Sequence, residues 1–319
     1  MNRHIKKYYF YLLGIFYDFI KRYDDAVDAY SKVLRYRFFF ANTSERFGKA
    51  YAKCNKTKNN KKSALMICGG VGDFLQHVPY MLNNKSDCYV IITHFPKAKD
   101  FFETIGVKVE KIYTFTDREE EKAIVESVSK EVNLYRCPRN LLMDTSPFLP
   151  ETPIYNNNYP VVGLHAGGSS YAVNKEIKSG NVPKTLPKSY IDGLIKELGK
   201  LDVNVIFFGM KSEIESFDIS ENEKLKFSCH QDITKSLSVV SQCNAFVGSD
   251  SAFKTMSSML KIPTIVLCSA PKNNFRDRMF IDPYIKHQIM SAFKYTTFSN
   301  KEVETAIAYT KITLMKALN

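Results

Sequence analysis

From residue 63 onward, short apolar runs alternate with segments that have the apolar spacing of helices. The runs cover residues 64–68, 88–93, 107–114, 161–165, 203–208, 245–247 and 264–268. Helix-like segments lie between the later runs, at 188–200, 233–242 and 253–260. Apolar strands separated by helices are typical of parallel sheets that are covered on both faces. The pattern predicts an α/β fold built from parallel sheets.

The 319 residues are enough for two medium-sized domains. An irregular, proline-bearing stretch at 137–159 interrupts the alternation and is the best candidate for a connection between two α/β units. We predict a helical cap with a basic linker at 1–62, a short Rossmann-like domain at 63–155, a second Rossmann-like domain at 156–300, and a last helix at 301–319 that packs back on the first α/β domain.

The first 55 residues have helical spacing and a weak internal repeat. An offset of 34 residues, the tetratricopeptide period, aligns chemically related pairs. These pairs are Leu13 with Phe47, Gly14 with Gly48, and Tyr17 with Tyr51. In a tetratricopeptide-like hairpin, the small residues would let the two helices approach closely, and the aromatic residues would fill the space between them. Two unrelated amphipathic helices would give much of the same pattern.

The positive charge of the chain is concentrated at its start. Residues 1–62 carry 15 Lys and Arg against five Asp and Glu, whereas the whole chain has a net charge of +12. The first fifth therefore holds +10 of that charge. Such a region suits an anionic partner, namely a membrane face, the phosphates of a glycolipid, or DNA. A well-solvated helical surface is the alternative interpretation.

Targeting and metal signals are weak. No run of about 18 uncharged apolar residues predicts a membrane-spanning helix. The apolar run at 8–15 has basic flanks but is followed by Tyr17 and Asp18, so we interpret it as a helix of the mature protein. The seven Cys residues are scattered without a CxxC pair, which is typical of reduced thiols in the cytoplasm. We expect no bound metal, because no metal-ligand spacing occurs.

A glycine-rich loop follows the first predicted strand of the first α/β unit. It contains Gly72 and Asp73 and leads into a helix. The glycines allow a tight turn with exposed backbone amides. Asp73 is a candidate general base, and capping of the following helix is the alternative role for its carboxylate.

Three further loops lie at predicted strand ends or helix starts of the second unit. Gly167, Gly168 and Ser169 follow the strand at 161–165 and could cradle a diphosphate with backbone amides and a hydroxyl. Lys184 precedes the helix at 188–200. A turn with Asp250 and Ser251 comes before the helix at 253–260, whose free amides form a second anion site. Asp250 would repel a phosphate if it pointed inward, so we expect it to fix the turn or to face a hydroxyl.

Taken in order, these loops resemble the motifs of glycosyltransferase family 9, the bacterial heptosyltransferase family. The resemblance covers roughly residues 63–285. It rests on five segments: Gly72-Asp73 through Pro79, His165-Ala166-Gly167, Lys184 through Pro187, Gly209 through Glu213, and Asp250-Ser251-Ala252 through Pro263. Ala252 and Thr255 stand where the family has Gly and often His.

The resemblance implies the GT-B architecture, in which two Rossmann-like domains face a cleft. It implies that Asp73 deprotonates the acceptor hydroxyl and that Gly72 and His77 belong to the acceptor-side loop. It further implies that Lys184 neutralises donor phosphate and that Glu213 binds the ribose hydroxyls. Ser251 and Ala252 would then present hydrogen-bond donors to the diphosphate of the nucleotide sugar.

The leading hypothesis is therefore a glycosyltransferase that acts on a cell-envelope saccharide or glycolipid. We expect an inverting, metal-independent transfer from a nucleoside-diphosphate sugar, without another cofactor. One alternative is a nucleic-acid glycosyltransferase whose basic cap holds DNA. Another is a non-catalytic tetratricopeptide-type adaptor, which the replacements at Ala252 and Thr255 leave open. The expected location is cytoplasmic, with peripheral attachment at the inner membrane face as an option.

Overall fold

The computed structural model describes residues 3–34, 42–54, 57–58, 61–69, 71–95, 97–139, 141–143, 152–167, 185–215, 217, 219–229, 232–269, 289–295 and 298–319. The chain divides into two compact units between Leu141 and Leu142. Each unit has its own sheet, which is parallel apart from one short hairpin in the first unit. The α/β class with two parallel sheets and an N-terminal helical segment, predicted from the sequence, is confirmed.

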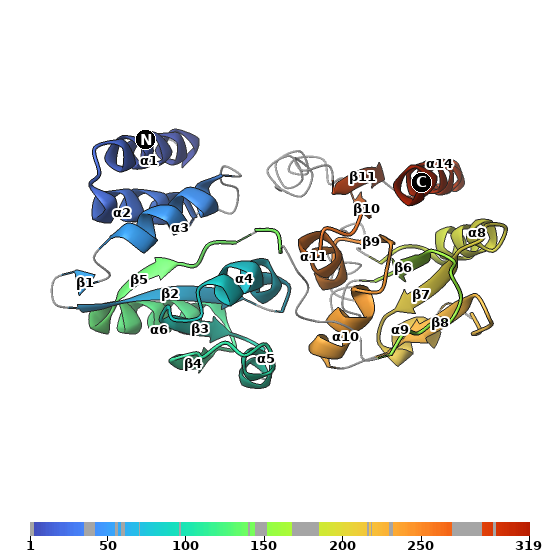
Figure 1. Ribbon diagram of the computed structural model, residues 1–319, viewed down its shortest axis with the longest axis horizontal. Helices are drawn as coiled ribbons and strands as arrows, with labels where there is room; N and C mark the ends of the chain where they lie inside the picture. Colours follow the sequence, from blue (N-terminus) through green and yellow to red (C-terminus); the bar gives the residue numbers. More distant parts are fainter. Residues whose placement is uncertain are drawn as a thin grey trace. The chain divides into compact units, whose positions relative to one another are not determined.

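The first unit places three helices before a five-stranded sheet (Figure 1). Its elements are α1 (Arg3–Phe19), α2 (Tyr23–Leu34), α3 (Thr43–Lys53), β1 (Thr57–Lys58), β2 (Lys61–Gly69), α4 (Val71–Asn83), β3 (Tyr89–Thr93), α5 (Ala98–Thr104), β4 (Lys111–Thr114), α6 (Arg118–Glu131) and β5 (Asn133–Arg136).

The N-terminal helices form a tightly packed hairpin followed by a third helix. Gly14 of α1 lies against Tyr30 of α2, and a Cβ on Gly14 would lie 2.5 Å from the Tyr30 ring. The small residue therefore allows the close approach expected from the sequence. Figure 1 shows α2 between α1 and the rest of the first unit. The tetratricopeptide assignment itself stays a prediction.

The helical segment is anchored to the sheet by edge-to-face aromatic contacts. Phe47 and Tyr51 of α3 each meet the ring of Tyr135 on β5, with centroids 6.3 and 6.0 Å apart. All three rings are buried. Burying such rings contributes on the order of 1.5–3 kcal/mol each, so the helices are part of the fold of the first unit.

Strand β2 is central in the first sheet, with β3 and β4 on one side and β5 on the other. Its residues are buried on both faces, which explains the continuous apolar run in the sequence. Ala64 and Met66 face α6 through Val128. The opposite face is covered in part by α4, in which Phe74, Leu75 and Val78 are buried.

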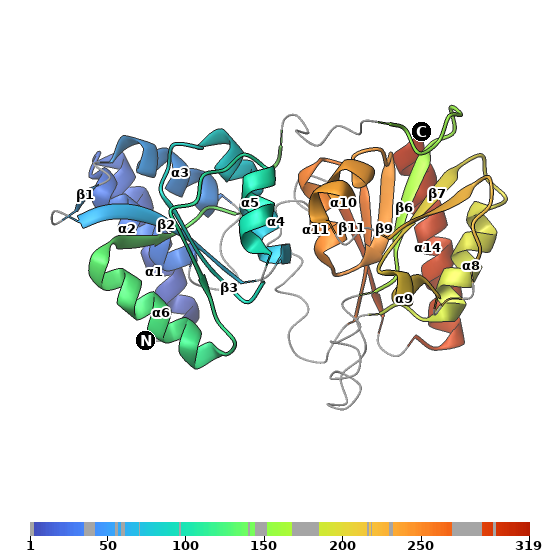
Figure 2. The same cartoon turned by 90° about the horizontal axis from the view of Figure 1, so that it is seen from below.

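The second unit is a six-stranded parallel sheet with helices on both faces (Figure 2). Its strand order is β11-β10-β9-β6-β7-β8. The elements are β6 (Val161–His165), α8 (Lys188–Leu198), β7 (Asn204–Phe208), α9 (Lys211–Glu215), β8 (Leu225–Ser228), α10 (Ile233–Val240), β9 (Ala245–Ser249), α11 (Ala252–Met259), β10 (Thr264–Ser269), β11 (Met290–Tyr295) and α14 (Asn300–Leu318).

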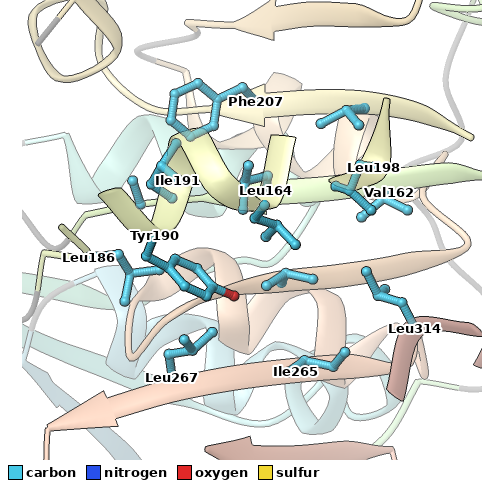
Figure 3. Packing of buried hydrophobic residues seen from close by; sticks show 14 of the residues in the cluster. Val162, Leu164, Leu186, Tyr190, Ile191, Leu198, Phe207, Ile265, Leu267 and Leu314 are labelled. Carbon is cyan, nitrogen blue, oxygen red and sulfur yellow. The ribbon is translucent and has the colours of Figure 1, made fainter. Parts of the chain in front are cut away.

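The last helix, α14, completes the core of the second unit. Val303, Ala306 and Leu314 are buried in the same cluster as the strands and α8. Figure 3 shows Leu314 beside this cluster, and the hydroxyls of Tyr190 and Thr310 are 2.8 Å apart where α8 meets α14. One side of α14 is thus buried within the second unit, and the predicted packing of residues 301–319 on the first α/β domain stays a prediction. The buried side of α14 packs against the sheet of the second unit, which directly precedes it in the chain.

Candidate functional site

The second sheet has a topological switch point between β6 and β9. From β6 the chain continues to β7 and β8 on one side, whereas β9, β10 and β11 lie on the other side. His165 at the end of β6 is in register with Gly248 near the end of β9. In open parallel sheets, the crevice at such strand ends is the usual place for a ligand. The loops that the sequence singled out begin at this point.

Polar groups without partners gather around these strand ends. Within the described part of the chain, Nδ1 of His165, Oγ of Ser249, Oγ of Ser251 and Oγ1 of Thr185 are buried and make no hydrogen bond. Leaving one such group unsatisfied costs about 1–3 kcal/mol. Because most buried polar groups in proteins are paired, this cluster marks the strand ends as a candidate binding site.

The start of α11 offers backbone amides next to these side chains. Ser251 is the N-cap residue, with an extended backbone, yet its hydroxyl makes no capping hydrogen bond. Ala252 is the first helical residue, and the first amides of a helix have no partner within the helix. An anion at this position would meet both the amides and the Ser251 hydroxyl.

A lysine that the sequence analysis did not select also belongs to this turn. Nζ of Lys254 lies 3.2 Å from Oδ1 of Asp250, and only 11% of the Lys254 side chain is exposed. The pairing follows from the spacing of four residues, which places both side chains on one side of the helix start. Asp250 thus holds a cation at the turn that precedes α11. Lysines are rarely buried, so residue type alone does not suggest Lys254. The four-residue spacing from Asp250 is the one feature of the sequence that could have indicated the pair.

A second group of residues converges beyond the end of β6. The amide of Leu186 donates to the carbonyl of Ala166 at 2.7 Å, which brings Thr185 beside Gly167. A Cβ on Gly167 would lie 3.9 Å from both Thr185 Oγ1 and Glu213 Oε1. The other carboxylate oxygen of Glu213 accepts a hydrogen bond from the amide of Met210 at 2.9 Å. Thr185 and Glu213, from two different segments, therefore lie around the position that a side chain on residue 167 would take.

His165 is held as a neutral ring beneath the site. Its ring lies against the ring of Phe253 of α11 in a tilted arrangement, with centroids 4.6 Å apart. Burial lowers the pKa of His165 to about 3, so the imidazole is uncharged at neutral pH. It can offer a hydrogen bond to a ligand but no positive charge.

Three of the predicted donor-binding residues, Gly168, Ser169 and Lys184, lie outside the described residues. The structure brings the others together at one sheet edge: Gly167, Glu213, Asp250, Ser251 and Ala252. Their roles toward a donor stay predictions.

In the first unit, Asp73 lies at the carboxyl end of β2, at the start of α4. Gly69, the last residue of β2, has a φ of 127°, and a Cβ there would lie 2.3 Å from Oδ2 of Asp73. Thr93 of β3 fixes the same turn, since its hydroxyl donates to the Gly69 carbonyl at 2.6 Å. Gly72 lies next to Asp73 in the first turn of α4. The turn over which the carboxylate lies is therefore fixed by the ends of two adjacent strands.

His77 has a structural environment. It is buried, and its Nδ1 donates to the carbonyl of Pro138 at 2.8 Å, which ties α4 to the segment after β5. Burial lowers the pKa of His77 to about 3. The contact explains why a histidine fits here, and a role in acceptor binding stays a prediction.

We compared the sequence and the structure with those of known proteins. No protein-family model and no curated protein matches the sequence. Among solved structures, the Escherichia coli ADP-heptose lipopolysaccharide heptosyltransferase II is similar, with a TM-score of 0.53 and 11% identity over 80% of this chain and 98% of that chain.

Two further structures align with lower scores. The glycosyltransferase family 9 protein of Veillonella parvula has a TM-score of 0.48 and 10% identity, over 82% of this chain and 100% of that chain. E. coli heptosyltransferase WaaC has a TM-score of 0.47 and 9% identity, over 78% and 99%. At these identities the similarity is one of fold. The chain has the α/β fold of heptosyltransferase II.

Proposed function

We propose that the protein is a glycosyltransferase that takes its sugar from a nucleoside-diphosphate donor bound at the β6–β9 switch point. The observation that carries this proposal is the group of buried, unpartnered polar atoms at His165, Ser249 and Ser251, beside the N-terminus of α11. Its place in a chain with the fold of an ADP-heptose enzyme supports a nucleotide sugar as the missing partner.

The proposed reaction is a single inverting displacement without a metal ion. Asp73 accepts the proton of an acceptor hydroxyl, whose oxygen forms a bond to the anomeric carbon of the sugar. The bond between that carbon and the diphosphate oxygen breaks, and the leaving diphosphate takes the electron pair. The amides of α11, Lys254 and the predicted Lys184 would stabilise the charge that develops on the diphosphate.

The most direct test of the donor is a thermal-shift screen against nucleoside diphosphates and nucleotide sugars. A ligand that binds only the folded protein, present at a hundred times its Kd, stabilises it by about 2.7 kcal/mol, so true donors will raise the melting temperature. Release of nucleoside diphosphate in the presence of candidate acceptors then measures transfer. If no nucleotide or nucleotide sugar raises the melting temperature, the proposed donor site is wrong.

The proposed acceptor is a cell-envelope saccharide or glycolipid, in keeping with the lipopolysaccharide enzyme of similar fold. The nucleic-acid alternative rests on the net charge of residues 1–62. It is tested by gel shift with duplex DNA over a salt series, because binding through phosphates weakens steeply with salt. The adaptor alternative predicts that nucleotide sugars bind without any transfer.

A further inference from the structure

The outward face of α1 is a row of large apolar and aromatic side chains. The six most prominent members are 52–83% exposed. They are Ile5, Tyr8, Tyr9, Leu12, Phe16 and Phe19, which we call the α1 stripe. Their spacing of one, three or four residues puts them on one side of a helix. Only four other large hydrophobic side chains of the described residues outside positions 5–20 are comparably exposed.

The α1 stripe is not the side of α1 that packs within the first unit. The opposite side of α1 is already used: Gly14 meets Tyr30, and the Tyr11 hydroxyl donates to Oδ1 of Asn42 at 2.6 Å. The ring of Phe10 lies 5.3 Å from Nζ of Lys32 of α2. Because α2 fills the inner side, the stripe faces away from the hairpin. A contiguous apolar patch of this kind marks an interaction surface.

Charge indicates what covers the stripe. Lys6 and Lys21 are exposed at its two ends, and Arg22 lies beside Lys21. Residues 1–62 together carry a net charge of +10. A second copy of the chain would bring two such regions into contact, which like-charge repulsion opposes. An anionic phospholipid surface offers a negative headgroup layer directly above an apolar interior, so it matches both properties of α1.

The composition of the stripe fits the depth of a headgroup layer. Tyr8 and Tyr9 have an apolar ring and a polar tip, which suits the boundary between water and lipid. Leu12, Phe16 and Phe19 can enter the acyl region beneath it. With 17 residues, α1 is about 25 Å long, enough for a helix that lies flat on a membrane. None of the described helices is both long and apolar enough to cross a bilayer.

We infer that α1 is a peripheral membrane anchor, which inserts the α1 stripe into anionic phospholipid while its basic residues contact the headgroups. This inference does not depend on the proposed transferase activity. It assigns the attachment to apolar side chains of one helix, with the positive charge in a supporting role. Binding should therefore weaken at high salt without being abolished, since the apolar contribution is not screened.

A single tryptophan can test insertion directly, because the chain contains no Trp. In F16W, emission should shift to shorter wavelength on addition of phosphatidylglycerol–phosphatidylethanolamine vesicles, and brominated acyl chains should quench it. The matched control is M315W on α14, where Met315 is 46% exposed. Its emission should not respond. If F16W and M315W behave alike, insertion of α1 is wrong.

A flotation assay with the same vesicles measures the contribution of the stripe. We expect the double variant Leu12→Glu with Phe16→Glu to lose at least about tenfold in partitioning, because two apolar anchors are replaced by charges that anionic lipid repels. The control is Ile312→Glu with Met315→Glu, which removes two similarly exposed apolar residues of α14. Unchanged thermal unfolding of both variants shows that they fold.

Two further results would overturn the inference. One is vesicle binding that the stripe variant does not reduce. The other is a dimer of the unmodified protein in light scattering without lipid that the same substitutions convert to a monomer. That outcome would make a second copy the occupant of the stripe. Vesicles of pure phosphatidylcholine should bind more weakly than those with phosphatidylglycerol, and equal binding would contradict the role assigned to the basic residues.

Discussion

The carboxylate of Asp73 lies over the backbone of Gly69, so closely that a side chain at position 69 would collide with it. The Cβ of an alanine there would lie 2.3 Å from Oδ2, and the φ of 127° is strained for any residue other than glycine. The glycine at the end of β2 therefore determines where the proposed base stands.

Gly69→Ala should lower both stability and transfer. Backbone strain of this kind costs on the order of 1–3 kcal/mol, and the displaced carboxylate would no longer be in place. Urea denaturation and the rate of nucleotide release measure the two effects.

Asp73→Asn separates the effect on transfer from the effect on stability: kcat should fall about 10²–10⁴-fold while nucleotide affinity and stability stay nearly unchanged. Unchanged transfer in Asp73→Asn would remove Asp73 as the base.

Ser251 and Ser299 are both N-cap residues, but only one of them caps its helix. Ser299 accepts a hydrogen bond from the amide of Glu302 at 3.3 Å in a capping box, whereas Ser251 makes none. Ser299→Ala should therefore cost about 1 kcal/mol of stability and leave nucleotide affinity unchanged. Ser251→Ala should do the reverse, with affinity about tenfold weaker. Equal effects of both variants on affinity would contradict the donor site at α11.

Gly167→Ala tests the space beside Glu213. The added Cβ meets no atom closer than 3.9 Å, so the folded protein has room for it. We expect thermal stability without ligand to change by less than about 0.5 kcal/mol, as for ordinary tolerated substitutions. Nucleotide binding measured by calorimetry should weaken, because the methyl group would occupy the space assigned to the donor. Full affinity in this variant would place the donor elsewhere.

Two buried histidines make the stability of the protein depend on pH. Burial lowers the pKa values of His77 and His165 from 6.5 to about 3. Between these values the unfolded chain binds protons that the native protein does not, so stability falls as the pH drops from about 6.5 towards 3. Each histidine contributes a slope of up to about 1.4 kcal/mol per pH unit.

Urea denaturation at pH 7.5 and pH 5 checks this dependence. His77→Asn keeps an amide donor for the Pro138 carbonyl but does not titrate, so the loss of stability at pH 5 should be smaller than in the unmodified protein. An identical pH dependence in His77→Asn would show that this histidine is not buried in its neutral form.

The core contribution of α14 is tested by truncating one side chain at a time. Leu314 is 1% exposed, and Leu314→Ala should destabilise the second unit by about 2–5 kcal/mol. The neighbouring Met315 is 46% exposed, and Met315→Ala should change stability by less than about 0.5 kcal/mol. Thermal unfolding monitored by calorimetry compares the two, and equal effects would contradict the orientation of the helix.

The elements that were predicted best are those with a clear apolar pattern, either an unbroken apolar run or a helical spacing of apolar residues. The strand at 161–165 and the helices near 188–200 and 253–260 were expected within two residues of their observed bounds. Strands β5, β8 and β11 were missed because polar residues alternate with apolar ones, as in Lys226 between Leu225 and Phe227. Such short alternating segments have little signal without their neighbours.

The candidate site was predictable only where residue type alone suggested chemistry. Ser251 and Glu213 were selected by loop position and family resemblance. Lys254 was not, because a lysine within a helix is ordinarily a solvated residue, and only the fold shows that it is buried against Asp250. The packing of α14 on the second sheet was not predicted for a related reason: an apolar stripe predicts burial but does not identify the surface that covers it.

The burial of α14 also bears on the order in which the protein can fold as it is synthesised. The described strands and helices of the first unit all lie before residue 141, so its core can close while the second unit is still being made. The second sheet cannot be fully covered until Val303, Ala306 and Leu314 have left the ribosome, because these residues complete its core. A nascent chain from which α14 has not yet emerged should therefore carry a folded first unit and an exposed, protease-sensitive second unit.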